Sequence, residues 1–286
     1  MHILIENVTH WYRSAFFPEH RALYNVNLEI QPKEILAVVG ATGSGKTTLI
    51  QHLNGLLQPT SGRVIVNSQD LMKGDLEKIR KQVGLVFQFP ENQLFEDTVF
   101  NDVAFGPRNL KLSEAKIEER VHSSLALVGL DYRRFKDLSP FHLSGGEKRC
   151  VAIAGTLAME PETLVFDEPT VGLDRNGSLR IEKIIHSYHR KGKTVIFISH
   201  DMDLVARLAK RVVVLTHGEI QYDGSRTCLV QDESILKEAG LALPQVSRYL
   251  QDLRKRGIPV KTTLFTREEV KQEIKRVFKK GLMKGS

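Results

Sequence analysis

Short runs of apolar residues, bounded by polar or turn-forming residues, recur along the first 225 positions of the chain. They predict strands at residues 3–5, 28–30, 34–39, 163–166, 194–198 and 212–215. Segments with helical spacing separate the later strands. Strands that alternate with helices predict a largely parallel sheet with helices on its faces, which is an α/β fold.

Helical spacing dominates residues 94–159. One clear helix is expected from Ser113, which could cap it, to Gly129, which could end it. Its apolar positions are Ile117, Val121, Leu125 and Val128. We interpret this stretch as a helical insertion into the α/β core.

The strand pattern stops after Gly224, and two amphipathic helices are predicted beyond it. Thr266 and Glu269 have the spacing of a capping box at the start of the second helix. The apolar positions of the two helices are Val246, Tyr249, Leu250 and Leu253, then Val270, Ile274 and Val277. The predicted domains are therefore 1–225 and a small helical appendage, 226–286.

Charge is distributed unevenly between these two parts. The chain has 286 residues and a net charge of +7, and residues 226–286 hold 14 Lys and Arg against 7 Asp and Glu. Basic tails can bind nucleic acid or anionic lipid. Here the basic residues alternate with acidic and apolar ones, which favours a solvated helical face, and no nucleic-acid partner is expected.

No apolar run approaches the ~20 residues that cross a bilayer, and the first residues do not resemble a signal peptide. A cytoplasmic protein is therefore expected. The two cysteines, Cys150 and Cys228, form no C-x-x-C pair and are interpreted as inert thiols.

A glycine-rich loop follows the strand at 34–39 and matches G-x-x-x-x-G-K-[ST] in full. Its glycines let backbone N–H groups face phosphate oxygens, and the following helix N-terminus favours negative charge. Lys46 is expected to reach the β- and γ-phosphates of ATP, and the Thr47 hydroxyl to bind Mg²⁺. The predicted phosphate-binding residues are Gly40, Ala41, Thr42, Gly43, Ser44, Gly45, Lys46, Thr47 and Thr48.

Two carboxylates end the apolar strand at 163–166. A strand of this kind ends at the sheet edge where α/β proteins bind ligands. Asp167 could hold Mg²⁺ through water, and Glu168 could orient or deprotonate the attacking water.

Residues 143–147 (Leu-Ser-Gly-Gly-Glu) resemble the signature of ABC ATPases, and they lie between the phosphate loop and the carboxylate strand as in that family. The resemblance implies a phosphate-loop, RecA-like ATPase core with antiparallel N-terminal strands and a helical insertion. Four further residues match the family's order: Gln88 (glutamine loop, nucleotide and Mg²⁺), Asp174 (D-loop), His200 (switch histidine) and Tyr12 (adenine stacking). Trp11 is adjacent to Tyr12, and either ring could be the base platform.

The family sandwiches ATP between the phosphate loop of one subunit and the signature of another. Ser144 and the backbone near Gly145 and Gly146 would then contact a γ-phosphate held by a partner. One copy of each motif makes two half-sites, so a partner is required.

Residues 87–95, 103–107 and 151–155 resemble the ATPases of energy-coupling-factor (ECF) vitamin and metal importers. The insertion 13–21 and the basic tail resemble the second ATPase subunit of that family, whose C-terminal extension helps it pair. The resemblance implies a peripheral ATPase at the cytoplasmic face of the membrane. Its implied partners are a second ATPase (a heterodimer), a transmembrane coupling subunit and a substrate-binding membrane subunit.

Phe89, Leu94 and Phe95 are expected to form an apolar groove for a helix of the coupling subunit, with Glu91 pairing an arginine of that helix. Two alternatives remain open: the ATPase of an ordinary ABC solute importer, and a soluble ABC ATPase that acts on nucleic acid or ribosomes. The transported solute is recognised by another subunit and is not encoded here.

Overall fold

The computed structural model describes residues 1–13 and 18–282. The chain forms two compact units: residues 1–34 with 47–198, and residues 35–46 with the chain from residue 199 onward. The boundary falls inside the glycine-rich loop, between Lys46 and Thr47. No helix in the described part of the chain has the length and apolarity needed to span a bilayer.

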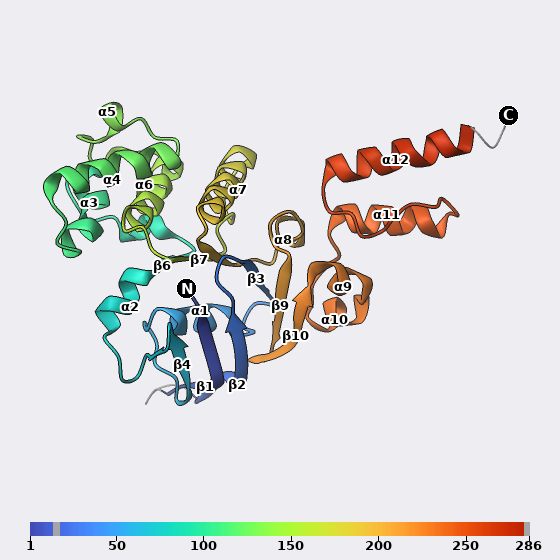
Figure 1. Ribbon diagram of the computed structural model, residues 1–286, viewed down its shortest axis with the longest axis horizontal. Coiled ribbons are helices and arrows are strands. Elements are labelled where there is room, and N and C mark those ends of the chain that lie inside the picture. Colours follow the sequence, from blue (N-terminus) through green and yellow to red (C-terminus); the bar gives the residue numbers. More distant parts are fainter. Residues whose placement is uncertain (14–17, 283–286) are drawn as a thin grey trace. The chain divides into compact units, whose positions relative to one another are not determined.

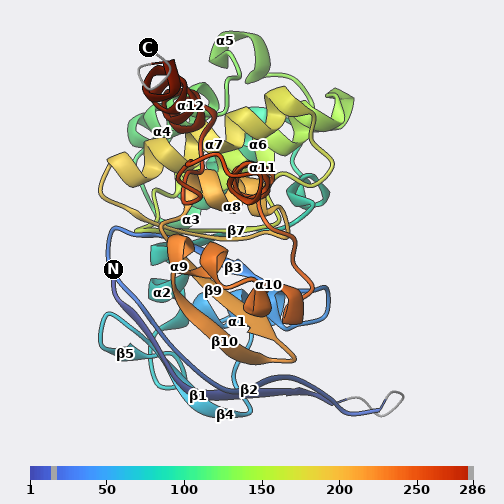
Figure 2. The ribbon, with the colours of Figure 1, turned by 90° about the vertical axis from the view of Figure 1, so that its right-hand side faces the viewer.

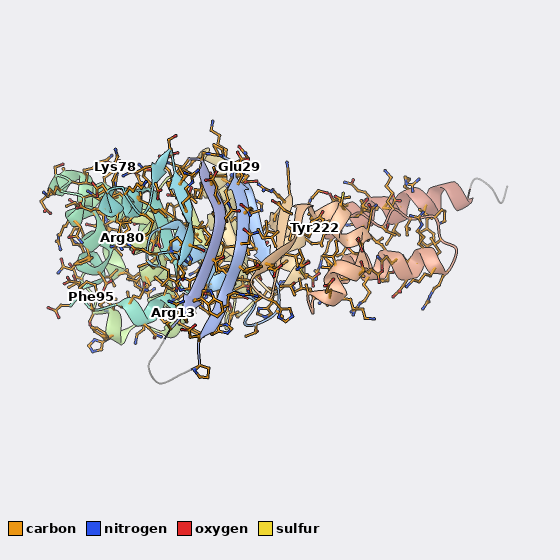
Figure 3. All side chains as sticks on the ribbon, turned by 90° about the horizontal axis from the view of Figure 1, so that it is seen from below. Arg13, Glu29, Lys78, Arg80, Phe95 and Tyr222 are labelled. Atoms are coloured by element: carbon orange, nitrogen blue, oxygen red, sulfur yellow. The ribbon has the colours of Figure 1, made fainter. Side chains whose placement is uncertain are left out.

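An antiparallel sheet forms one part of the first unit, in the order β2-β1-β4-β5. Its two long strands, β1 (Ile3–Tyr12) and β2 (His20–Ile30), run side by side in Figure 3. β4 (Ser61–Val66) pairs with β1, and β5 (Gln69–Asp70) pairs with β4. Of the expected insertion at 13–21, residues 14–17 lie outside the described residues.

The strands β1 and β2 are much longer than the runs predicted at 3–5 and 28–30. Register shifts interrupt their pairing at several points between Ile5 and Trp11, so the inward-facing pattern changes along each strand. A two-residue periodicity cannot be followed across such irregularities, which is why the sequence indicated only the regular ends.

Three parallel strands form the buried part of the first unit. β7 (Thr163–Asp167) lies between β6 (Val83–Val86) and β8 (Thr194–Ile198), and every residue of the three strands is buried. Strands buried on both faces need apolar residues throughout, as these sequences have. The strands predicted at 163–166 and 194–198 are confirmed, whereas β6 was not predicted.

Helices make up the remainder of the first unit, and those from α3 to α6 gather in one group (Figure 1). Within this group α6 packs against both α3 and α4. The helices are α1 (Lys46–Leu53), α2 (Leu76–Gln82), α3 (Val99–Asn109), α4 (Glu114–Leu127), α5 (Tyr132–Phe135), α6 (Gly145–Ala158) and α7 (Arg175–Arg190), with short 3₁₀ turns at Pro90–Gln93 and Pro140–His142.

The helix predicted between Ser113 and Gly129 is α4. Its predicted apolar positions Ile117, Val121 and Leu125 are buried. Gly129 follows it with φ +77°, a conformation that suits glycine. Ser113 stands at the N-cap position, but its side chain makes no capping hydrogen bond, so the expected cap was wrong.

The second unit contains three strands, with β3 (Ile35–Val39) parallel to β9 (Arg211–Thr216) and β10 (Glu219–Ser225) antiparallel to β9. Its helices are α8 (Met202–Leu208), α9 (Arg226–Gln231), α10 (Glu233–Glu238), α11 (Gln245–Lys255) and α12 (Arg267–Leu282). Figures 1 and 2 show α9 and α10 beside β10.

The two tail helices form as predicted. The N–H of Thr266 donates to Glu269 Oε2 at 2.8 Å, and the N–H of Glu269 donates to Thr266 Oγ1 at 3.2 Å, which confirms the capping box. Contacts continue across residue 225, because Phe265 is buried with Ala206 and Val230. The boundary of the appendage at 226 stays a prediction.

Candidate functional site

The glycine-rich loop connects β3 to α1. Gly40 has φ +151°, and a Cβ there would lie 2.1 Å from the carbonyl oxygen of Leu215, so the close approach of β9 requires glycine. Gly43 has φ +81° and no described atom within 4 Å of its Cβ position, so only its backbone conformation demands glycine. Residues 41–43 of the loop are exposed.

The Lys46 ammonium lies over this loop. Its Nζ donates to the carbonyl oxygens of Gly40 at 2.9 Å and Ala41 at 2.8 Å. The side chain is largely buried, so its charge is held where phosphate groups are expected. All of these residues belong to the second unit.

Thr47 and Thr48 begin the first unit's part of the site, in the first turn of α1. The Thr47 hydroxyl donates to Asp167 Oδ2 at 3.0 Å, which joins α1 to the end of β7. Asp167 is buried with the rest of that strand. The hydroxyl and the carboxylate that the sequence predicted as Mg²⁺ ligands, 120 positions apart in the chain, are thus neighbours.

Glu168, the next residue, has an unusual backbone conformation. Its φ is +46°, which is uncommon for any residue other than glycine, and its N–H donates to the carbonyl oxygen of Ile198 at 3.2 Å. The chain therefore turns sharply after β7, and the Glu168 side chain is only half-buried. Backbone strain of this kind is concentrated at functional sites and costs roughly 1–3 kcal/mol.

Tyr12 lies on the same part of the first unit. Its hydroxyl and the Thr48 hydroxyl are 3.1 Å apart, and its ring is 42% exposed. Trp11 points the other way, because neighbouring residues of a strand face opposite sides, and the guanidinium of Arg21 lies 5.8 Å from its ring centre. The position beside α1 favours Tyr12 as the base platform.

The signature segment forms the N-terminus of α6. Ser144 caps this helix: its N–H and hydroxyl donate to Glu147 Oε2 at 2.9 and 2.6 Å, and the Glu147 N–H donates to its Oγ at 3.4 Å. These hydrogen bonds lower the pKa of Glu147, so the signature carries a carboxylate charge. Gly145 and Gly146 are exposed in the first turn.

Asp174 caps α7 by accepting from the Gly177 N–H at 2.7 Å. Together with Ser144 and Gly146 it lines a cavity of about 380 Å³ between α6 and α7. The structure therefore brings the predicted signature and D-loop residues to one place within the first unit.

Arg149 was missed by the sequence reasoning. It is 5% exposed, and its Nη1 and Nη2 donate to the carbonyl oxygens of Val171 at 2.8 Å and Pro169 at 2.9 Å. It thus fixes α6 to the segment between Glu168 and Asp174. Burial lowers its pKa, and the negative charge of Glu91 opposes that effect.

Glu91 is half-buried, and its expected pairing with an arginine of the coupling subunit stays a prediction. Its Oε2 is buried and, like Arg149 Nε, has no hydrogen-bond partner among the described residues. Its charge acts on Arg149 inside the same unit. Leu94 is also buried, at 9% exposure, whereas Phe89 and Phe95 are exposed as expected. Of the three apolar residues expected in the groove, Phe89 and Phe95 are thus available at the surface and Leu94 is not.

Gln88 and His200 lie just after two of the buried strands. Gln88 is half-buried and follows β6, two positions before a short 3₁₀ turn. His200 is exposed and follows β8; the N–H of its neighbour Ser199 donates to the Val38 carbonyl oxygen at 3.3 Å. Gln88 belongs to the first unit and His200 to the second.

Residues 23–171 match the family model described as ABC transporter. The chain is 48% identical to the energy-coupling factor transporter ATP-binding protein EcfA2 of Clostridium tetani, over 97% of this chain and 98% of that protein. It is 45% identical to the protein of that name from Streptococcus pyogenes, over 96% of this chain and 99% of that protein.

Solved structures give the same result. CbiO1 from Clostridium perfringens, part of the ABC transporter complex cbiONQ, aligns with a TM-score of 0.71 and 34% identity, over 87% of this chain and 98% of that one. The ATP-binding cassette MJ0796, a dimer with ADP and Pi bound, aligns with a TM-score of 0.70 and 30% identity. The alignment covers 78% of this chain and 98% of that one.

These matches define the class: the chain belongs to the ABC transporter family. Within that family it is similar along nearly its whole length to the ATP-binding proteins of energy-coupling factor transporters, and it is an ATP hydrolase of this type coupled to transport. The predicted fold class, family and enzymatic activity are confirmed. The individual site residues stay predictions.

We predict that Arg149→Met destabilises the first unit, because it leaves two carbonyl groups and the Glu91 carboxylate without their buried partner. The free energy of unfolding, measured in urea, should fall by about 3 kcal/mol. Lys148→Met, one residue earlier on the same helix, is the control and should change it by less than about 0.5 kcal/mol. Equal effects of both substitutions would show that the Arg149 contacts contribute nothing specific.

Proposed function

We propose that the residues assembled around α1 bind and hydrolyse MgATP to power import of a micronutrient, a vitamin or transition metal ion, through an ECF-type transporter. The observation that carries the proposal is the contact of Thr47 with Asp167 beside the strained backbone of Glu168. The chain would act as a peripheral subunit at the cytoplasmic face of the membrane.

Mg²⁺ suits the pair formed by Thr47 and Asp167. This ion prefers oxygen ligands and keeps several waters, so that one hydroxyl, one carboxylate and phosphate oxygens suffice. Bound there, it would neutralise charge on the transferred phosphoryl group. Gln88, in the segment after β6, would be a further ligand of this ion.

The remaining roles follow from chemistry and position. Lys46 and the loop backbone would hold the β- and γ-phosphates, and Tyr12 would stack on the adenine. Glu168 would orient and deprotonate the attacking water, because its half-buried carboxylate follows the Mg²⁺ ligand directly. His200, which follows β8, would contact the γ-phosphate, as the switch histidine of the family does.

We further propose that the chain pairs with a second ATPase subunit. Its signature, with Ser144 at the α6 N-terminus, would close over ATP bound to the companion, and Asp174 would lie at the same interface. The similarity to MJ0796, which was solved as a dimer with ADP and Pi, supports this arrangement. The ionised Glu147 carboxylate lies beside Ser144. The signature would therefore present a less positive potential to phosphate than the helix N-terminus alone would give.

The tail offers a second contact for the companion. A cavity of about 490 Å³ between α11 and α12 is lined by apolar residues, among them Val246, Tyr249, Val270 and Ile274, and by a basic row. Arg267, Lys271 and Lys275 form this row at i, i+4 spacing on α12. An amphipathic helix with acidic flanks, supplied by the companion, fits this groove.

A membrane partner would bind at a different place on the first unit. A groove of about 560 Å³ is lined by Phe105 and Met159 and by Arg80 of α2. The rings of Phe105 and Phe95, whose centres are 4.9 Å apart, meet edge to face. Figure 3 shows Phe95, Lys78 and Arg80 along this part of the unit. A helix of the transmembrane coupling subunit would place apolar residues against Phe105.

Glu168→Gln should retain ATP binding and lower kcat by at least about 100-fold, because a general base typically contributes 10²–10⁴-fold. Lys46→Ala should instead raise the Kd for ATP. Nucleotide binding by equilibrium dialysis and phosphate release on both variants test this difference. Near-normal turnover by Glu168→Gln would falsify its assigned role.

The pairing proposal predicts different effects at two sites. Ser144→Arg should block ATP-dependent closure with the companion but leave nucleotide-free association intact, since charge and bulk fill the γ-phosphate position. Ile274→Asp in the tail groove should weaken association with or without ATP. Sedimentation of mixed subunits measures both, with Lys255→Asp as a control on exposed α11 surface. If Ser144→Arg subunits close normally with ATP, the sandwich arrangement does not hold.

Phe105→Asp should uncouple the subunit from its membrane partner, because a charge would enter the apolar groove. The purified chain should keep its ATPase activity, while uptake in cells and copurification with membrane subunits should fall at least about tenfold. Phe141→Asp, another exposed phenylalanine on the first unit, is the control. Normal uptake by Phe105→Asp would place the membrane contact elsewhere.

A further inference from the structure

Two histidines lie directly behind Tyr12 and form with it a closed ring of contacts. His10 is on β1, two positions before Tyr12, and His52 is on α1, four positions after Thr48. The His10 ring meets the Tyr12 ring edge to face, with centres 4.7 Å apart, and meets the His52 ring in the same way at 4.8 Å. The Tyr12 hydroxyl and the Thr48 hydroxyl close the ring.

The hydrogen bonds fix where the protons of both histidines lie. His52 Nδ1 is 2.7 Å from the Thr48 carbonyl oxygen, and His10 Nδ1 is 3.1 Å from the Gln58 carbonyl oxygen. A carbonyl oxygen only accepts, so both Nδ1 atoms carry hydrogen. His52 Nε2, 3.2 Å from His10 Nδ1, then accepts from that same hydrogen.

This arrangement suits two neutral histidines. A proton on His52 Nε2 would point at the N–H of His10, and both side chains are buried. Burial lowers the pKa of His52 to about 4 and also lowers the pKa of His10, and the hydrogen bonds to the Thr48 and Gln58 carbonyl oxygens oppose these shifts only in part. Gln58 and Thr48 contact the pair through carbonyl oxygens, and Tyr12 contacts it through its ring. The pair is therefore a fixed support and not a pH switch.

Tyr12 needs such a support because its ring is 42% exposed. A partly exposed aromatic ring changes rotamer readily, and each rotamer would direct its face differently. The hydroxyl contact with Thr48 holds one end of the ring, and the edge contact with His10 holds its side. His52 holds His10 and is itself bonded to the backbone of Thr48, next to the predicted Mg²⁺ ligand Thr47.

We propose that His10 and His52 are positioning residues that hold the Tyr12 ring in the plane required to stack on the adenine of ATP. They would then determine the part of nucleotide affinity that depends on the base, without touching the nucleotide. The inference rests on the proposed function of Tyr12 as the base platform.

The test compares ATP with inorganic tripolyphosphate, which has the phosphates and lacks the base. In the full chain, His10→Asn keeps a donor near Nδ1 and loses the ring, whereas His10→Phe keeps a ring and loses the donor. His52→Gln removes the ring that contacts His10. Tyr12→Ala removes the platform itself, and His186→Asn on exposed α7 surface is the matched control. Circular dichroism verifies that each variant is folded.

We expect His10→Asn and His52→Gln to raise the Kd and KM for ATP about tenfold, the loss typical of one base–aromatic stack. The Kd for tripolyphosphate, and kcat at saturating ATP, should stay within about twofold. His10→Phe should recover part of the ATP affinity. Combining His10→Asn with Tyr12→Ala should add no further loss, because both remove the same interaction. The wild-type ratio of the two Kd values should be constant from pH 6 to 8.

Three results would overturn the inference, and each has a different meaning. If Tyr12→Ala weakens ATP selectively but the histidine variants do not, the platform exists and needs no histidine support. If Tyr12→Ala leaves the ratio of ATP to tripolyphosphate affinity unchanged, Tyr12 is not the platform, and the proposed role of Tyr12 fails with it. Equal weakening of both ligands by the histidine variants would instead indicate a general disturbance of α1, and would also overturn the inference.

Discussion

The hydrogen bond from Thr47 to Asp167 is the contact on which the site of the first unit depends. It joins the first turn of α1 to the carboxyl end of a strand whose residues are all buried. Neither element can shift without separating the two oxygen groups that suit Mg²⁺. The chain turns directly after Asp167, where Glu168 has a positive φ, so the predicted water-orienting carboxylate follows the predicted Mg²⁺ ligand without an intervening residue.

Arg149 extends this constraint to the helical group. By donating to two carbonyl groups after Glu168, it ties the signature helix to the segment that leads to Asp174. A movement at the end of β7 would therefore be transmitted to Ser144 through a rigid helix and one guanidinium group. These contacts would give nucleotide binding at the end of β7 a physical route to the helical group within the first unit.

Much of this could be predicted because the determining patterns are local. Strand β7, helix α4 and the Thr266–Glu269 capping box each depend on residues within a few positions of one another. Predictions that depended on surroundings were confirmed only in part. Leu94 looked like a surface residue because Pro90 and Asn92 break regular structure, but packing buries it. Glu91 is half-buried, with one carboxylate oxygen buried and its charge acting on Arg149. Ser113 stands at the right position and makes no cap.

The sequence by itself determined the class of protein, because the phosphate loop, the strand ending in Asp167 and Glu168, and the signature are contiguous motifs whose spacing has a direct chemical meaning. It could not choose between Trp11 and Tyr12. Only the tertiary structure decided which ring lies beside Thr48, and only it brought His10 against His52, 42 positions away. Such contacts depend on which face of β1 is turned toward α1. The orientation of a strand's two faces is set by the sheet and the helix that pack on it, and not by the sequence of the strand alone.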